Sequence, residues 1–278
     1  MEKEADQQFA PVAAGPRASD AQPLLLRILP RPLRTLYEWS VLYACLGQIA
    51  ASGLLLSFVG MILTPLLPRA TATRFGQRAI SGIFRVTTWI MRASGIVRLD
   101  LTALDDLRDA GPLVLAPNHP SMLDAVFVIS RLPSVACVMK HEIHHNVFLG
   151  GGARLAGYIG NATTTGMLRG VARALGDGQQ VLLFPEGTRT VTQPINALKG
   201  SFAIAAKQAG VPVQTIIIQT NSPFLSKGWS IFRKPEFPLE YRVRLGRRFQ
   251  VSDLRTAVAD TDAHLRRELG PDNRLRGR

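Results

Sequence analysis

Short apolar runs alternate with amphipathic stretches through most of the chain. Five runs rich in Val, Leu and Ile have the length and composition of buried strands: residues 97–101, 113–116, 135–139, 181–184 and 213–219. Helical periodicity between these runs predicts helices near residues 121–131, 165–175 and 199–209. Gly176 and Gly210 suit the ends of the last two helices. The alternation predicts an α/β fold with a central, mostly parallel sheet flanked by helices.

The two ends of the chain follow other patterns. Residues 241–245, Tyr-Arg-Val-Arg-Leu, alternate with a period of two, which predicts a half-exposed edge strand. An amphipathic helix is predicted for residues 252–269. Residues 1–23 have the composition of a disordered tail, and residues 271–278 form a basic tail with little to pack.

One long segment contains no charge at all. From Trp39 to Pro68, 30 consecutive residues are uncharged, which exceeds the roughly 20 needed to span hydrocarbon. We therefore expect this segment to enter a membrane. Arginines lie on both sides of it, so the positive-inside rule indicates no orientation. Two arrangements stay open: a segment that enters and returns, or an oblique, partly embedded helix.

A second helix is predicted for residues 73–93. Four arginines recur along one stripe of it: Arg74, Arg78, Arg85 and Arg92. A cationic stripe beside apolar and aromatic residues is typical of a helix in the lipid headgroup layer. The same pattern fits a surface helix packed on its own domain. We expect residues 24–95 to form a membrane-associated two-helix segment before a catalytic domain at residues 96–270.

The overall charge agrees with a membrane partner. The chain has 33 Lys and Arg against 20 Asp and Glu, a formal charge of +13. Such a balance suits nucleic acid or an anionic membrane. The sequence has no zinc finger, basic zipper or RNA-binding signature, so we expect a lipid bilayer and no nucleic acid. Cys45 and Cys137 fall in the apolar segment and in a strand, which fits a reducing compartment without a disulfide.

The turn after the run at residues 113–116 carries candidate chemistry. It reads Asn-His-Pro-Ser-Met-Leu-Asp, with His119 in the turn and Asp124 one helical turn further on. A carboxylate that holds one ring nitrogen leaves the other free as a general base. We also expect backbone N–H groups after Pro120 to stabilise an oxyanion. Alternatively, Ser121 and Asp124 form a capping box that only ties up the start of a helix.

A second polar turn follows the run at residues 181–184 and reads Phe-Pro-Glu-Gly-Thr-Arg, residues 184–189. Gly187 permits unusual backbone angles and a close approach of a ligand. Thr188 and Arg189 offer a hydroxyl and a planar cation, which suit phosphate. A plain turn with an exposed Glu186–Arg189 ion pair is the alternative. Both turns leave apolar strands at the carboxyl edge of an α/β sheet, where such folds bind ligands.

With both motifs in view, the chain resembles the glycerolipid and lysophospholipid acyltransferases over about residues 96–248. The resemblance implies that His119 is the base on the acceptor hydroxyl and that Asp124 orients it. It implies direct transfer from an acyl thioester without an acyl-enzyme, and the chain has no Gly-x-Ser-x-Gly elbow. It also implies an N-terminal helical pair resting in the membrane. We expect these residues to bind substrate: Asn118, Glu186, Gly187, Thr188, Arg189 and Lys199.

Two departures from the family pattern concern the acceptor. The middle block, residues 157–161, lacks the arginine that the family usually places near the acceptor phosphate, and residues 211–216 keep one proline of two. Lys199 either replaces the missing charge or is an exposed lysine at a helix start. We expect 1-acyl-glycerol-3-phosphate as the acceptor, with a non-phosphorylated or polyene-type lipid as the alternative. The donor is acyl-CoA or acyl carrier protein, and no tightly bound cofactor or metal is implied.

Two remote alternatives remain. Residues 141–145 match the His-Glu-x-x-His zinc motif, but residues 146–176 contain no Asp, Glu, His or Cys as a third ligand. A membrane scaffold that has lost its chemistry is the other alternative, and the presence of both His119 and Asp124 argues against it. We expect a location in a membrane, the inner membrane of a bacterium. The family chemistry places the catalytic domain on the cytoplasmic side, where acyl thioesters are made.

Overall fold

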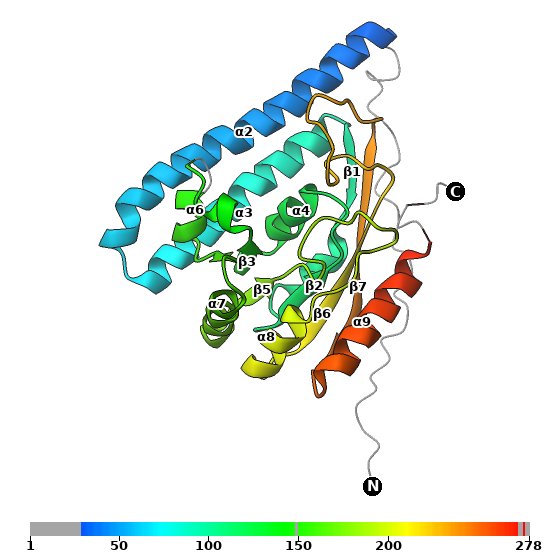
Figure 1. Cartoon of the computed structure of the whole chain (residues 1–278). Helices are drawn as coiled ribbons and strands as arrows, with labels where there is room; N and C mark the ends of the chain where they lie inside the picture. Colours follow the sequence, from blue (N-terminus) through cyan, green and yellow to red (C-terminus); the bar gives the residue numbers. More distant parts are fainter. Residues whose placement is uncertain (1–28, 148–149, 272–274, 276–278) are drawn as a thin grey trace.

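A seven-stranded sheet between two layers of helices forms the body of the molecule (Figure 1). The computed structural model describes residues 29–147, 150–271 and 275. The tail predicted for residues 1–23 lies outside the described residues, as does most of the basic tail at 271–278.

The sheet confirms the predicted α/β fold. Its strand order is β1-β7-β6-β2-β5-β3-β4, and every neighbouring pair is parallel except β6 with β7. All five predicted strands are present. The strands are β1 Val97–Asp100, β2 Val114–Pro117, β3 Val135–Met139, β4 Ile159–Gly160, β5 Gln180–Leu182, β6 Val213–Thr220 and β7 Leu239–Phe249.

The prediction of an edge strand at residues 241–245 is partly confirmed. Tyr241 and Arg242 of β7 pair with both β1 and β6, whereas residues 243–245 pair with β6 alone. The sequence alternates because one face of β7 packs on the core while the other stays partly open. A period of two reports the exposure of a face, and it says nothing about whether the backbone is paired.

Alternate residues of the strands face opposite helical layers. Leu115 of β2 belongs to the core on the side of α4, whereas Val114 and Ala116 face the other layer. Fully burying such a side chain contributes about 1.5–3 kcal/mol, so each face of the sheet is well anchored. The first layer holds α3 Arg69–Ala93, η1 Thr102–Leu107 and α4 Leu123–Arg131; the second holds α7 Thr164–Gly176, α8 Ser201–Ala209 and α9 Leu254–Leu269.

The predicted helix ends are partly confirmed. Gly210 ends α8 in the left-handed conformation, with φ 64°. Gly176 still belongs to the last turn of α7, and the left-handed residue is Gly178, with φ 79°. Two short helices, α5 His141–His144 and α6 Gly150–Leu155, connect β3 to β4.

The uncharged segment belongs to one continuous helix, α2 Arg31–Leu66, and α3 Arg69–Ala93 follows directly after it. With 36 residues, α2 is roughly 54 Å long. It does not turn back within the segment, so the chain returns only through α3, which lies alongside it (Figure 1). α2 passes so close to α6 that a Cβ on Gly60 would lie 2.7 Å from the carbonyl oxygen of Gly151.

The outer faces of the two helices differ in chemistry. α2 is long and apolar enough to cross a membrane, and only 17% of its most apolar window is buried. Its exposed large apolar residues from Leu54 onward are Leu54, Leu55, Phe58, Met61, Ile62 and Leu66. All four arginines of the predicted stripe on α3 are exposed, and so are Phe75, Val86 and Trp89. α3 also packs on α4, so it is both a domain helix and a cationic outer face.

Candidate active site

The two polar turns meet at one edge of the sheet. β2 and β5 are parallel neighbours, so the segments that follow them leave the sheet side by side. The backbone N–H of Thr190 donates to the carbonyl oxygen of His119 at 2.7 Å. The carboxyl edge expected from the sequence therefore carries both motifs.

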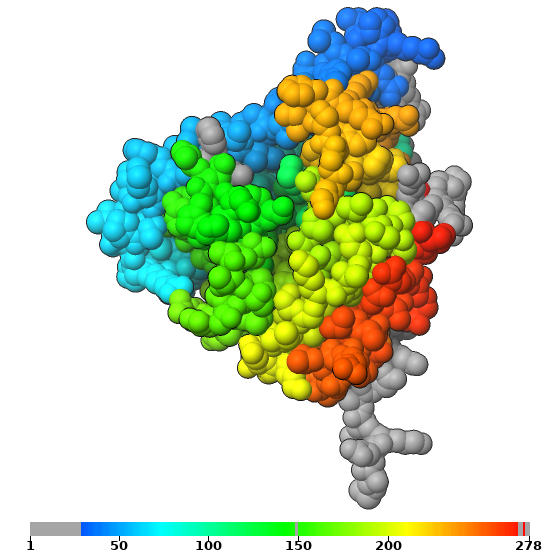
Figure 2. All heavy atoms as spheres, in the orientation of Figure 1, coloured from blue at the N-terminus to red at the C-terminus, as the bar shows by residue number. Residues whose placement is uncertain are grey.

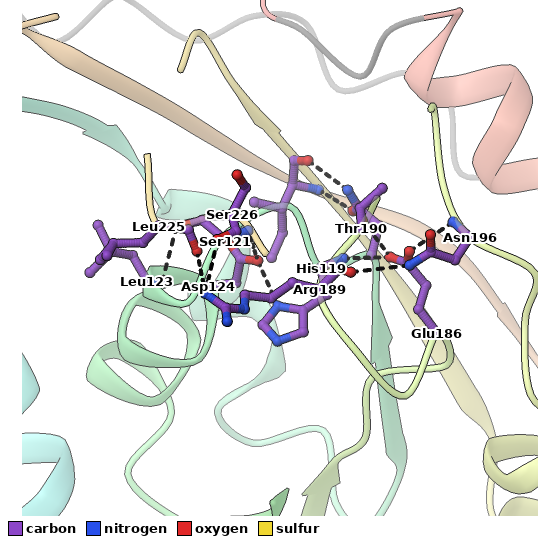
Figure 3. Close-up of polar contacts among 12 residues, drawn as sticks. His119, Ser121, Leu123, Asp124, Glu186, Arg189, Thr190, Asn196, Leu225 and Ser226 are labelled. Carbon is purple, nitrogen blue, oxygen red and sulfur yellow. Dashed lines mark hydrogen bonds and ion pairs between the residues drawn. The ribbon is translucent and has the colours of Figure 1, made fainter. Parts of the chain in front are cut away.

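His119 and Asp124 form a hydrogen-bonded pair (Figure 3). Nδ1 of His119 lies 2.8 Å from Oδ2 of Asp124. The imidazole stacks on Phe184, with ring centroids 3.8 Å apart, and 16% of the His119 side chain remains exposed. Because a carboxylate only accepts, Nδ1 carries the proton and Nε2 is the basic nitrogen. The pair has the arrangement of a general base with an orienting carboxylate.

Asp124 also closes the start of α4. Its Oδ2 accepts the backbone N–H of Ser121 at 2.8 Å, and its side chain is fully buried. Burial raises the pKa of Asp124, while the hydrogen bonds from His119 and Ser121 and the charge of Arg189 act in the opposite direction. The capping alternative and the orienting role thus use the same oxygen and are compatible.

The expectation of a backbone oxyanion site after Pro120 is not met. The N–H of Ser121 donates to Asp124, that of Met122 donates to the carbonyl oxygen of Leu225, and that of Leu123 donates to the Ser121 hydroxyl. These donors close the first turn of α4 and are already used. Side chains are therefore the better candidates for stabilising a developing oxyanion.

Glu186 holds the second turn against the first. Its Oε1 accepts the backbone N–H of His119 and the Thr190 hydroxyl, both at 2.8 Å, and its Oε2 accepts the N–H of Asn196 at 2.8 Å. Only 2% of the residue is exposed, and burial raises the pKa of this carboxyl. The predicted ion pair of Glu186 with Arg189 is not among the salt bridges of the described residues. Glu186 therefore positions the loop that carries His119.

The tip of the second turn is open and cationic. Gly187 is exposed, with φ 66°, and a Cβ there would lie 2.8 Å from Nζ of Lys199. The exposed Lys199 side chain thus lies across the turn, while Thr188 is half-exposed beside it. This places a second cation on the motif that also contains Arg189.

Arg189 reaches a third segment that the sequence did not mark. Its Nη1 donates to the carbonyl oxygens of Leu225 and Ser226 at 2.9 and 3.1 Å, in the loop between β6 and β7. Leu225 has φ 55°, a rare conformation for leucine that occurs at functional sites. This loop also lies beside the start of α2 (Figure 2), where Lys234 contacts Glu38 at 2.6 Å. The loop is rich in Pro and Ser, but no local pattern connects it with residues a hundred positions earlier.

Asn118 differs from its expected role as a substrate ligand. Its amide nitrogen donates to the carbonyl oxygen of Ile218 at 2.8 Å, and its amide oxygen accepts the N–H of Ile218 at 2.7 Å. The residue is fully buried. Asn118 therefore extends the pairing between β2 and β6 and fixes the point where the turn leaves the sheet.

The middle block and the His-Glu-x-x-His segment lie at the edge of the sheet formed by β3 and β4. The middle block forms β4 and borders a hollow of about 320 Å³, which three arginines line: Arg69, Arg154 and Arg173. Of residues 141–145, the first four form the short helix α5, and His145 follows its end. No group of three His, Cys, Asp or Glu that could hold a metal occurs among the residues described.

Comparisons with known proteins agree with this site. The acyltransferase family model matches residues 98–219. The chain is 23% identical to the 1-acyl-sn-glycerol-3-phosphate acyltransferase of Pseudomonas aeruginosa, over 66% of this chain and 72% of that protein. It is 28% identical to the lyso-ornithine lipid O-acyltransferase of Rhizobium meliloti, over 58% of this chain and 56% of that protein.

A solved structure shares the fold. The 1-acyl-sn-glycerophosphate acyltransferase of Thermotoga maritima superposes with a TM-score of 0.62 at 17% identity, covering 86% of this chain and 96% of that one. At this identity the likeness concerns the architecture. The matched family model and these relatives support an acyltransferase domain at residues 98–219 that is similar to glycerolipid acyltransferases.

Proposed function

We propose that the protein transfers a fatty acyl group from a thioester carrier to the hydroxyl of a lysophospholipid-like acceptor at a membrane surface. The observation that carries this proposal is the pair formed by His119 and Asp124 beside the cationic turn at residues 187–189. The pair supplies a base, and the turn supplies charges that suit a polar head.

The proposed reaction needs one proton carrier. Nε2 of His119 takes the proton of the acceptor hydroxyl while its oxygen attacks the thioester carbonyl carbon. Asp124 stabilises the resulting imidazolium through Nδ1. The tetrahedral intermediate then collapses, the carbon–sulfur bond breaks, and His119 returns the proton to the sulfur. The products are an ester and a free thiol, and no acyl-enzyme forms.

Charge around the turn favours 1-acyl-glycerol-3-phosphate as the acceptor. Arg189 and Lys199 both lie at the motif, and a planar guanidinium and an ammonium both suit a phosphate monoester. A non-phosphorylated acceptor is the second candidate. It is favoured by the middle block without arginine and by the similarity to an enzyme named for a lyso-ornithine lipid.

The helical pair suits the surface of a bilayer. We propose that α2 lies with its apolar outer face in lipid and that the cationic stripe of α3 meets anionic headgroups. Glu38, the acidic residue of α2, is buried and paired with Arg34 and Lys234, so it adds no charge to the outer face. In this arrangement the active site faces the cytoplasm of a bacterium, at the inner membrane.

Thiol release in a defined membrane tests the reaction. The full chain is reconstituted with acyl-CoA or acyl carrier protein thioester and a panel of acceptors: 1-acyl-glycerol-3-phosphate, monoacylglycerol and a lyso-ornithine lipid. Products are identified by mass spectrometry. His119→Ala should lose at least a thousandfold in rate and still bind vesicles, because the base is removed and α2 is untouched.

The exposed His145 offers a matched control, since His145→Ala removes an imidazole outside the pair. Wild-type activity in His119→Ala would place the base elsewhere. Activity that a chelator abolishes and zinc restores would revive the metal alternative at residues 141–145. No transfer to any acceptor by a folded, membrane-bound protein would favour the scaffold.

The acceptor is tested separately with Arg189→Ala. If Arg189 holds the phosphate, the apparent KM for 1-acyl-glycerol-3-phosphate should rise about tenfold or more with a smaller change in kcat. The KM for monoacylglycerol should stay unchanged, because that lipid has no phosphate. Equal effects on both acceptors would reject phosphate recognition by Arg189.

A further inference from the structure

Tyr241 lies near Asp124, whose charge acts on the tyrosine hydroxyl, and no step proposed above uses it. It belongs to the interior strand β7 and is 2% exposed. Its ring meets the edge of Phe127, with centroids 4.8 Å apart. Phe127 follows Asp124 by three residues on α4, so both side chains share one face of that helix. Tyr241 therefore packs against the face of α4 that carries Asp124.

Two buried polar atoms in this region have no hydrogen-bond partner. They are Oδ1 of Asp124 and the hydroxyl oxygen of Tyr241, judged over the residues that the structure describes. Nearly all buried polar atoms in folded proteins are paired, with protein or with an ordered water. A single hydrogen bond between these two atoms, direct or through one water, would pair both.

The neighbouring hydroxyls offer no better arrangement. The Ser121 hydroxyl donates to the carbonyl oxygen of Phe224 at 2.8 Å, and the Thr220 hydroxyl donates to that of Ser222 at 3.4 Å. Their protons are already used. Burial, and after it the charge of Asp124, raises the pKa of Tyr241 well above its ordinary value, while the nearby hydroxyls of Ser121 and Thr220 act in the opposite direction. Tyr241 is therefore a donor at neutral pH, and the carboxylate of Asp124 is the strongest acceptor beside it.

We propose that Tyr241 is a positioning residue of the acyltransferase site. Its hydroxyl donates to Oδ1 of Asp124, through one bridging water or after a small shift of the ring, and so holds Oδ2 in the orientation that meets Nδ1 of His119 and the N–H of Ser121. The effect on rate rests on the proposed function, whereas the hydrogen bond itself does not.

The proposed bond has an electrostatic consequence. With His119 neutral and Asp124 ionised, the pair carries one negative charge; after His119 takes a proton, the pair is neutral overall. A donor aimed at Oδ1 stabilises the negative pair more than the neutral one. Removing that donor should therefore make the pair easier to protonate, and its titration midpoint should move to higher pH.

Tyr241→Phe tests the proposal, because phenylalanine keeps the ring against Phe127 and removes only the hydroxyl. NMR titration of labelled histidines follows His119 directly and requires no substrate; His119→Ala assigns its signal. We expect the midpoint to rise by about half a pH unit, and kcat to fall roughly tenfold with KM unchanged.

Tyr158→Phe is the matched control. Tyr158 is also buried, and its hydroxyl is likewise without a partner among the described residues, but it lies beside Cys137 in the region of β3 and β4. The control should leave both the midpoint and kcat as in the wild type. Incorporation of 3-fluorotyrosine, a stronger donor of the same shape, into the Tyr158→Phe protein should move the midpoint in the opposite direction, to lower pH.

An unchanged His119 midpoint in Tyr241→Phe would overturn the proposal, even if the rate fell, because packing alone would explain the rate. An equal shift in Tyr158→Phe would overturn it as well. If the midpoint moves as expected while even the wild type transfers no acyl group, Tyr241 positions Asp124 and the proposed function is what fails. If Tyr241→Phe does not fold, the shift with 3-fluorotyrosine decides.

Discussion

Asp124 and Glu186 are two buried carboxylates at the ends of neighbouring strands, and the structure uses them differently. Both are at most 2% exposed, and burial raises the pKa of each. Asp124 holds an imidazole whose other nitrogen remains reachable. Glu186 holds two backbone N–H groups and a buried hydroxyl. A carboxylate in a sequence motif can therefore orient an imidazole, or it can hold only the backbone of a loop. Its hydrogen-bond partners show which of the two it does.

Replacing Asp124 by Asn should separate the two roles most strongly. Oδ2 of Asp124 accepts from both Ser121 and Nδ1 of His119, and the single oxygen of asparagine can keep both hydrogen bonds, so the start of α4 survives. Asparagine has no charge, however, so it no longer stabilises the imidazolium that forms when His119 takes the proton. We expect kcat to fall about 10³–10⁴-fold, measured by thiol release.

The unfolding midpoint of Asp124→Asn, followed by circular dichroism, should change by only a few degrees. If the variant transfers at a near wild-type rate, Asp124 is merely a cap and the contrast with Glu186 disappears.

Replacing Glu186 by Gln should instead act mainly on stability. Glutamine supplies one oxygen for three donors, and its NH₂ faces a backbone N–H that cannot accept, that of His119 or that of Asn196. Losing charge-assisted hydrogen bonds costs about 2–3 kcal/mol, which corresponds to a Tm lower by roughly 5–10 °C. We expect kcat to fall about tenfold, because the His119 loop loosens.

Glu240→Gln provides the comparison for this variant, because Glu240 forms a partly exposed ion pair with Arg98 at 2.7 Å. Its Tm should change by about 2 °C or less. A Glu186→Gln protein with unchanged Tm and a thousandfold slower reaction would mean that Glu186 contacts the reacting groups.

The smallest effect is expected in the pH dependence of stability. A carboxyl whose pKa is raised in the folded state adds stability below its unfolded pKa of about 4 and loses it as pH rises through the folded pKa. The difference in Tm, variant minus wild type, should therefore increase between pH 4 and pH 8 for Asp124→Asn and Glu186→Gln alike. A difference that decreases with pH would show that the hydrogen bonds outweigh desolvation at that carboxyl.

Local patterns in the chain predicted the hydrogen-bonded pair of His119 and Asp124 because all of its parts are close in sequence. An apolar strand, a polar turn and a helix start occupy residues 113–124, and the pair bridges five positions. The same holds for the turn at residues 184–189, which follows β5. Since β2 and β5 are parallel neighbours, both turns were expected at one edge, and the backbone bond between Thr190 and His119 agrees.

Contacts between distant segments could not be predicted in this way. Asn118 pairs with Ile218, a hundred residues away, and Arg189 is held by Leu225 and Ser226. Neither contact leaves a periodic signal, because each depends on which strands become neighbours. The edge strand is a further case: β7 alternates along its length, and only the position of β1 beside residues 239–242 makes that part of the strand interior.

The sequence by itself determined the α/β class, the pairing of His119 with Asp124, and the uncharged helix with its arginine-rich neighbour. These features depend on periodicity and on residues a few positions apart, which the chain geometry brings together in any fold. Only the tertiary structure decided that Glu186 accepts hydrogen bonds from the loop backbone, that Asn118 joins two strands and that Tyr241 lies near Asp124. Burial decides these roles, because a polar group removed from water must find its partner wherever the packed chain supplies one.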